Sequence, residues 1–126
     1  MWANNTQQVQ SRQFPAAPSD TYAALLKVAK NGFKLKTEDS YSLSLTFASG
    51  ASAFTWGESF SAQVLTAGDG STLNISGVGK VGGQLQQSSR TNKLIDGIFK
   101  RVSDVLQDEL AALRAALEVE KRQADK

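Results

Sequence analysis

The sequence contains no cysteine and no histidine among its 126 residues. The absence of cysteine excludes disulfide bonds, thiolate metal sites and cysteine nucleophiles. The absence of histidine removes the most common general base, the most common metal ligand and the usual serine triad. Because the acidic residues are scattered singly, no nucleophile can be paired with a base. We therefore expect a protein that is not an enzyme and that uses no metal and no cofactor.

Long apolar runs and a charge imbalance are also missing. No run approaches the roughly 18 apolar residues needed to cross a bilayer, and the first residues lack the basic and apolar segments of a signal peptide. Fourteen basic and twelve acidic residues give a net charge of +2, with the two signs interleaved. No basic patch for a nucleic acid results. We expect a cytoplasmic protein that binds neither nucleic acid nor a membrane.

Alternation of apolar and polar residues predicts a sheet of five strands. Gly68, Asp69 and Gly70 give the strongest hairpin signal, between the fourth and fifth strands, and residues 37–40 are expected to form the turn between the second and third. The expected strands cover residues 7–14, 33–35, 41–47, 54–64 and, starting at 73, the glycine-rich segment up to 83.

A short helix is expected between the first two strands. Pro18 opens it, Ser19 is the expected N-cap, and Gly32 supplies the left-handed residue that commonly closes a helix. With a second helix at the end, the chain is one domain of the α+β class with the order β-α-β-β-β-β-α. Because apolar side chains share one face of a curved, mostly antiparallel sheet, we expect both helices to pack on that face.

The last third of the sequence, from Ser89 to about residue 125, predicts one long helix with a single apolar stripe. Glu109 interrupts this stripe, and a carboxylate in a dry core would cost several kcal/mol unless paired. We interpret Glu109 as the point where the helix leaves the sheet. The expected organisation is a flexible segment over residues 1–6, a globular core over 7–109 and a protruding helix end over 110–126.

The protruding end carries the main functional prediction. Such a helix would be about 55 Å long, whereas a compact domain of this length is only about 35 Å across. Leu110, Leu113 and Leu117 form a narrow stripe flanked by charges, as in a short coiled coil. We expect the stripe to mediate self-association or docking onto another protein. The alternative is that it packs on the first strand or helix of the same domain.

The order of elements resembles the small helix-grip domains, also called TBP-like, and in topology the larger START and plant-allergen (Bet v 1-like) families. Those families typically enclose a hydrophobic ligand between the sheet and the long helix. The resemblance therefore implies, as an alternative function, a small hydrophobic ligand at that place. Tyr41, Trp56 and Phe60 would line the site together with the inner face of the helix.

Glu58 is a further candidate, because strict alternation places it on the inner face between Trp56 and Phe60. An inward carboxylate could donate a proton or anchor a ligand. In the competing interpretation Gly57 marks a bulge, which shifts the alternation and turns Glu58 to solvent. We favour the bulge.

Two further patterns are given structural interpretations. Residues 77–82 match GxGxxG, but residues 84–87 separate this motif from the expected helix and no strand follows that helix, so a strand end is favoured over a dinucleotide site. The polar sheet face lacks the aromatic and basic side chains of a nucleic-acid platform and is expected to be solvated. Its residues are Ser42, Ser44, Thr46, Ser61, Gln63, Asn74 and Ser76.

Overall fold

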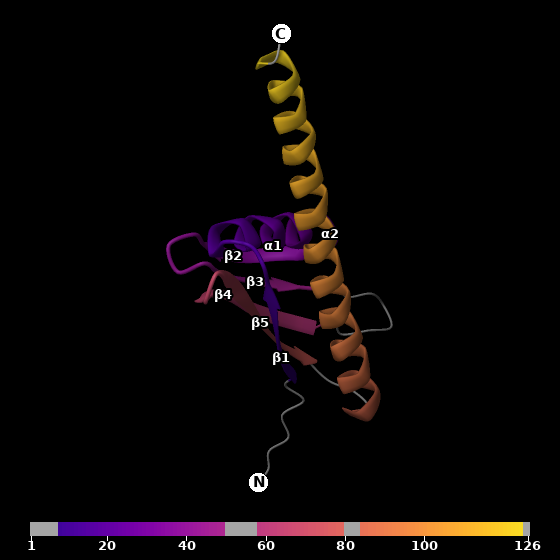
Figure 1. The fold of residues 1–126 in the computed structure, drawn as a ribbon. Helices are drawn as coiled ribbons and strands as arrows, with labels where there is room; N and C mark the ends of the chain where they lie inside the picture. The colour runs from indigo at the N-terminus through magenta and orange to yellow at the C-terminus, as the bar shows by residue number, and fades with distance from the viewer. Residues whose placement is uncertain (1–7, 50–57, 80–83, 125–126) are drawn as a thin grey trace.

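The computed structural model describes residues 8–49, 58–79 and 84–124, and these form five strands and two helices (Figure 1). The predicted α+β class and the order β-α-β-β-β-β-α are confirmed. The elements are β1 (Gln8–Phe14), α1 (Pro18–Gly32), β2 (Lys34–Asp39), β3 (Ser44–Ala48), β4 (Glu58–Ala67), β5 (Gly70–Gly79) and α2 (Gln84–Ala124).

The five strands form one antiparallel sheet in the order β1-β5-β4-β3-β2. The predicted hairpin connects β4 and β5, and Gly68 adopts φ 56° in its turn, a conformation that glycine reaches without strain. The first strand pairs with β5, so it forms the edge opposite to β2. Both helices pack on one face of this sheet, and no element among the described residues covers the other face (Figure 1).

The core lies between that face and the two helices. Alternating residues of the strands point into it, and Phe47 and Phe60 stack with ring centroids 5.1 Å apart. Ile98 and Phe99 of α2 are buried against the same cluster. Because these large side chains are almost fully buried, the described part of the space between sheet and long helix is filled by the protein itself.

The turn between β2 and β3 lies later than predicted, at residues 40–43 instead of 37–40. The Asp39 carboxylate accepts hydrogen bonds from the backbone N–H groups of Tyr41, at 2.9 Å, and Ser42, at 3.3 Å. Leu43 then adopts φ 57°, which is uncommon for a leucine. The hydrogen bonds to Asp39 and the conformation of Leu43 hold residues 40–43 in a turn. The strand β3 therefore begins only at Ser44, and Tyr41 lies in the turn.

The predicted ends of α1, Pro18 and Gly32, are confirmed, but both predicted caps are wrong. The N-cap is Ala17, with Pro18 in the first turn, because the Ala17 carbonyl accepts the N–H groups of Asp20 and Thr21. Gly32 has no left-handed conformation, and the helix ends instead as the chain extends at Phe33.

The long helix α2 begins at Gln84, five residues before the predicted start at Ser89. It therefore follows closely on β5, and the predicted spacer after the GxGxxG motif is wrong. In the described chain no strand follows α2 and the sheet is antiparallel, so the strand-helix-strand unit of a dinucleotide site is missing there. None of the described helices combines the length and apolar character required to cross a bilayer.

Candidate functional site

The distal end of α2 extends past α1 and the sheet (Figure 1). Val102 is the last fully buried residue of the helix, and Val105 and Leu106 still pack against the core. From residue 107 to 124 every residue is exposed, including Glu109. At about 1.5 Å per residue, this exposed part is roughly 27 Å long.

Three leucines on this exposed part form what we call the leucine stripe. Leu110, Leu113 and Leu117 are 48%, 56% and 54% exposed. They continue the helix face that Val102 and Leu106 present to the core, since residues three, four and seven apart share a face. A contiguous apolar surface that the rest of the domain leaves uncovered is typical of an interaction site.

A groove of about 580 Å³, which we call the base groove, lies where the helix leaves the domain. Its walls come from the segment that joins β1 to α1 and from the middle of α2. Leu110 and Leu113 form part of its lining and are still about half exposed, so the alternative prediction of packing on the first strand or helix stays open. The lining residues are Phe14, Pro15, Ala16, Ala17, Asp20, Ser103, Leu106, Gln107, Glu109, Leu110 and Leu113.

The base groove shows which way the leucine stripe faces. Because Leu110 and Leu113 share this groove with Phe14 and Ala17, the stripe points to the side of α2 on which the body of the domain lies. Sequence reasoning found the leucines through their helical spacing. It named the first strand or helix only as an alternative partner of the leucines, and it did not identify Phe14 and Ala17, because no pattern in the sequence relates individual residues about 90 positions apart.

The residues predicted to bind a hydrophobic ligand do not gather at one place. Tyr41 is 97% exposed in the turn after β2, so its predicted inward position is wrong. Trp56 lies outside the described residues. Phe60 is buried, where it stacks on Phe47 and meets the edge of Phe33.

Glu58 is fully buried at the start of β4, so the favoured bulge interpretation, which turned it to solvent, is wrong. Three hydrogen bonds join it to Ser49. The Ser49 hydroxyl donates to Glu58 Oε1 at 2.7 Å, the Glu58 N–H donates to Ser49 Oγ at 2.8 Å, and the Ser49 N–H donates to the Glu58 carbonyl at 3.0 Å. These bonds explain how a carboxylate is accommodated on the inner face.

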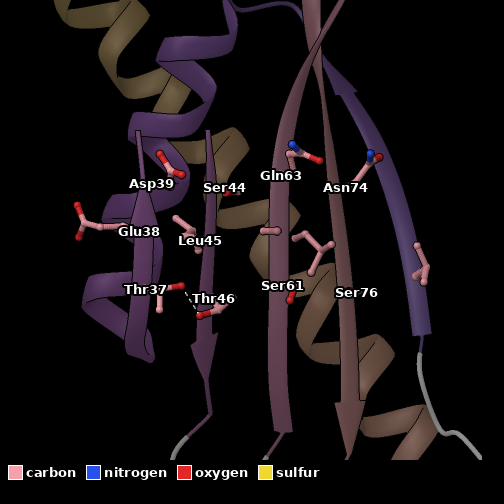
Figure 2. Close-up of a pocket in the computed structure, with 13 residues that line it drawn as sticks. Thr37, Glu38, Asp39, Ser44, Leu45, Thr46, Ser61, Gln63, Asn74 and Ser76 are labelled. Carbon is pink, nitrogen blue, oxygen red and sulfur yellow. Dashed lines mark hydrogen bonds between the residues drawn. The ribbon is translucent and has the colours of Figure 1, made fainter. Parts of the chain in front are cut away.

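The uncovered face of the sheet carries a shallow hollow of about 800 Å³, lined mainly by hydroxyl, amide and carboxylate side chains (Figure 2). The strand register aligns Thr37, Thr46, Ser61 and Ser76 in one row across four strands. Thr37 and Thr46 hydrogen bond to each other through their hydroxyls at 2.6 Å. Polar side chains that already pair with one another agree with the predicted solvated face.

Fold and site together define an α+β domain with START/Bet v 1-like topology, in which a long C-terminal helix packs on an antiparallel sheet. No protein-family model and no curated protein matches the sequence. The chain is similar to the crystal structure of Ara h 8.0201, with a TM-score of 0.65 and 13% identity over 83% of this chain and 99% of the other. It is also similar to TTHA0849 from Thermus thermophilus, with a TM-score of 0.53 and 14% identity over 79% of this chain and 98% of the other.

Proposed function

We propose that this chain is a noncatalytic interaction domain that binds a second copy of itself through the leucine stripe. The observation that carries the proposal is the exposure of Leu110, Leu113 and Leu117 on one face of a helix that extends past its own domain. Most helical stability in proteins comes from packing of an apolar face. A partner that covers this face would therefore stabilise the helix end as well as bury the leucines.

A second copy is favoured over an unrelated protein as the partner, because one positively and one negatively charged residue flank the leucine stripe. Arg114 and Glu118 lie one helical turn apart beside the stripe. Such an arrangement is self-complementary when the same surface meets itself about a two-fold axis, which is the most common symmetry of protein dimers.

The absence of a catalytic centre is also part of the proposal. It is supported by the composition, since histidine and cysteine are missing. Glu58, the most deeply buried acidic residue of the described chain, is engaged by the hydroxyl and backbone of Ser49. The cytoplasmic location remains a prediction of the sequence.

Sedimentation analysis over a range of concentrations tests the proposed function. We expect the parent chain to dimerise, and the double variant Leu113→Glu with Leu117→Glu to stay monomeric because it places charge on the apolar stripe. The matched control is Ala115→Glu with Val119→Glu, which adds the same charge at the same spacing to the opposite face and should dimerise like the parent. A parent chain that is monomeric at about 0.1 mM would contradict the proposal.

A second candidate function is binding of a small hydrophobic ligand between the sheet and α2, which the START/Bet v 1-like topology favours. Phe47, Phe60 and Phe99 fill that place in the structure, so a ligand would have to displace these side chains. Titration of the native protein with an apolar fluorescent dye tests it. Saturable binding of about one dye per chain supports this function, and no binding under native conditions would exclude a site open to such a dye.

A further inference from the structure

We propose that two copies pair their leucine stripes in antiparallel orientation, so that the end of each α2 lies in the base groove of the other copy. This inference rests on the proposed self-association and adds the orientation, the register and the place where the helix end docks. It is carried by the position of the base groove, the spacing of the leucines and the placement of the charges.

The orientation follows from the side on which the stripe lies. Leu110 and Leu113 face the side of α2 that also holds α1 and the sheet, as their contact with the base groove shows. A parallel partner helix would run along that same side and collide with α1 (Figure 1). The helix of an antiparallel partner contacts only the part of α2 that extends beyond α1. The sheet and α1 of that partner then lie beyond the C-terminal end of the first copy's α2.

The register follows from the spacing of the leucines. In antiparallel helix pairs, residues of the two alternating seam positions lie opposite each other. Placing Leu113 of one copy opposite Leu117 of the other forms two such layers, related by the two-fold axis. The same register sets Ala124 opposite Leu106, which lines the base groove. The described end of α2 of one copy thus reaches the base groove of the other copy. A longer overlap of the two helices would bring this end against α1 of the other copy.

Charged residues on one flank of the stripe complement this arrangement. At about 100° per residue, Arg114 and Glu118 lie on the same flank of α2. A two-fold axis brings the same flank of both copies together, so Arg114 of each copy lies beside Glu118 of the other. On the opposite flank Glu109, which lines the base groove, and Glu120 approach as like charges, and the same register sets Glu120 opposite Leu110. These contacts oppose pairing, so the attraction on the first flank has to exceed them.

A charge exchange tests the proposed neighbours. Arg114→Glu and Glu118→Arg should each weaken dimerisation, by about five- to tenfold, because each single change turns two attractive pairs into repulsive ones. The double variant with both changes should recover the parent dissociation constant. Because Arg114 and Glu118 are also an i, i+4 pair within one helix, circular dichroism of the monomers checks that helix content is equal in all variants. With equal helix content, recovery supports this arrangement, and a double variant that stays as weak as the single ones would overturn it.

Disulfide trapping tests the orientation, and the absence of native cysteine makes the result unambiguous. Chains carrying Leu113→Cys are mixed with chains carrying Leu117→Cys and oxidised. We expect the mixed 113–117 disulfide to dominate. Dominant 113–113 and 117–117 products would show a parallel pair, which overturns this inference while the proposed self-association stands. A parent chain that never dimerises would instead remove the proposed function itself.

Discussion

Thr91 is buried on the inner face of α2, and its hydroxyl has no hydrogen-bond partner among the described residues. A buried hydroxyl without a partner costs free energy, because it has lost its bond to water. We expect Thr91→Val, which keeps the shape and removes the hydroxyl, to raise the free energy of unfolding by about 1–2 kcal/mol. Urea unfolding measures the difference.

The methyl group of Thr91 provides the control for this prediction. A Cβ on Gly77 would lie 2.8 Å from that methyl carbon, so the site is closely packed and its volume matters. Thr91→Ala, which removes the hydroxyl and also the methyl, should therefore be less stable than Thr91→Val. Equal or lower stability of Thr91→Val relative to the parent would show that the hydroxyl has a partner in the folded protein.

Asp39 makes the stability of the β2–β3 turn dependent on pH. The N–H groups of Ser42 and Tyr41 donate to its carboxylate and hold its pKa below the ordinary value of 3.8. The folded state therefore favours the ionised form. Its stabilising contribution is complete above the ordinary pKa and is lost as the pH falls through the lowered one.

We expect Asp39→Asn to be less stable than the parent at about pH 7, because the neutral amide accepts the two N–H groups more weakly. The difference should shrink as the pH falls to about 2, because the parent carboxyl becomes increasingly protonated as the pH approaches its lowered pKa. Urea unfolding at both pH values provides the measurement. A difference that stays constant over this range would show that ionisation of Asp39 does not contribute.

The two halves of α2 differ in what they contribute to folding. Phe99 is buried among core residues, and Arg12 lies over its ring at 4.7 Å from the centroid. We expect Phe99→Ala to lower the free energy of unfolding by about 3–5 kcal/mol, which is a large fraction of the total for a domain of this size. Leu117→Ala should change it by less than about 0.5 kcal/mol at concentrations where the chain is monomeric.

Urea unfolding at low protein concentration compares these two variants. Repeating the measurement at high concentration provides the control, since Leu117→Ala should then lose the extra stability that dimerisation gives the parent. A large effect of Leu117→Ala on the monomer would show that the helix end packs on its own domain.

Elements with strong local signals were predictable from the sequence. The apolar stripe gave α2, and the turn residues at Gly68 gave the β4–β5 hairpin. The register of β3 was not predictable, because the side chain of Asp39 and the left-handed Leu43 moved the turn and carried Tyr41 out of the strand. Alternation alone placed Glu58 correctly, and the bulge inferred from Gly57 overrode it wrongly.

Packing of both helices on the sheet was predictable from the sequence, but the individual residues that line the base groove were not. The base groove joins the segment around Ala17 to the middle of α2, and no periodicity connects the two. The leucine stripe could be named from the sequence, but the side of the domain on which it lies could not. That side decides between parallel and antiparallel pairing, so the proposed dimer geometry depends on the tertiary structure.

The exposed edge strand β2 affects whether copies of the whole molecule can associate by adding strands to the sheet. Charged side chains crowd this short strand, including Lys34, Lys36 and Glu38, and its pairing with β3 shifts register between Leu35 and Thr37. Charges and irregular pairing at an edge discourage another chain from adding a strand. Strand addition at open edges can continue without limit and produce fibrils, whereas a two-fold contact between helix ends is complete after two copies. The chain thus combines an edge that resists open-ended growth with a helix surface suited to a finite assembly.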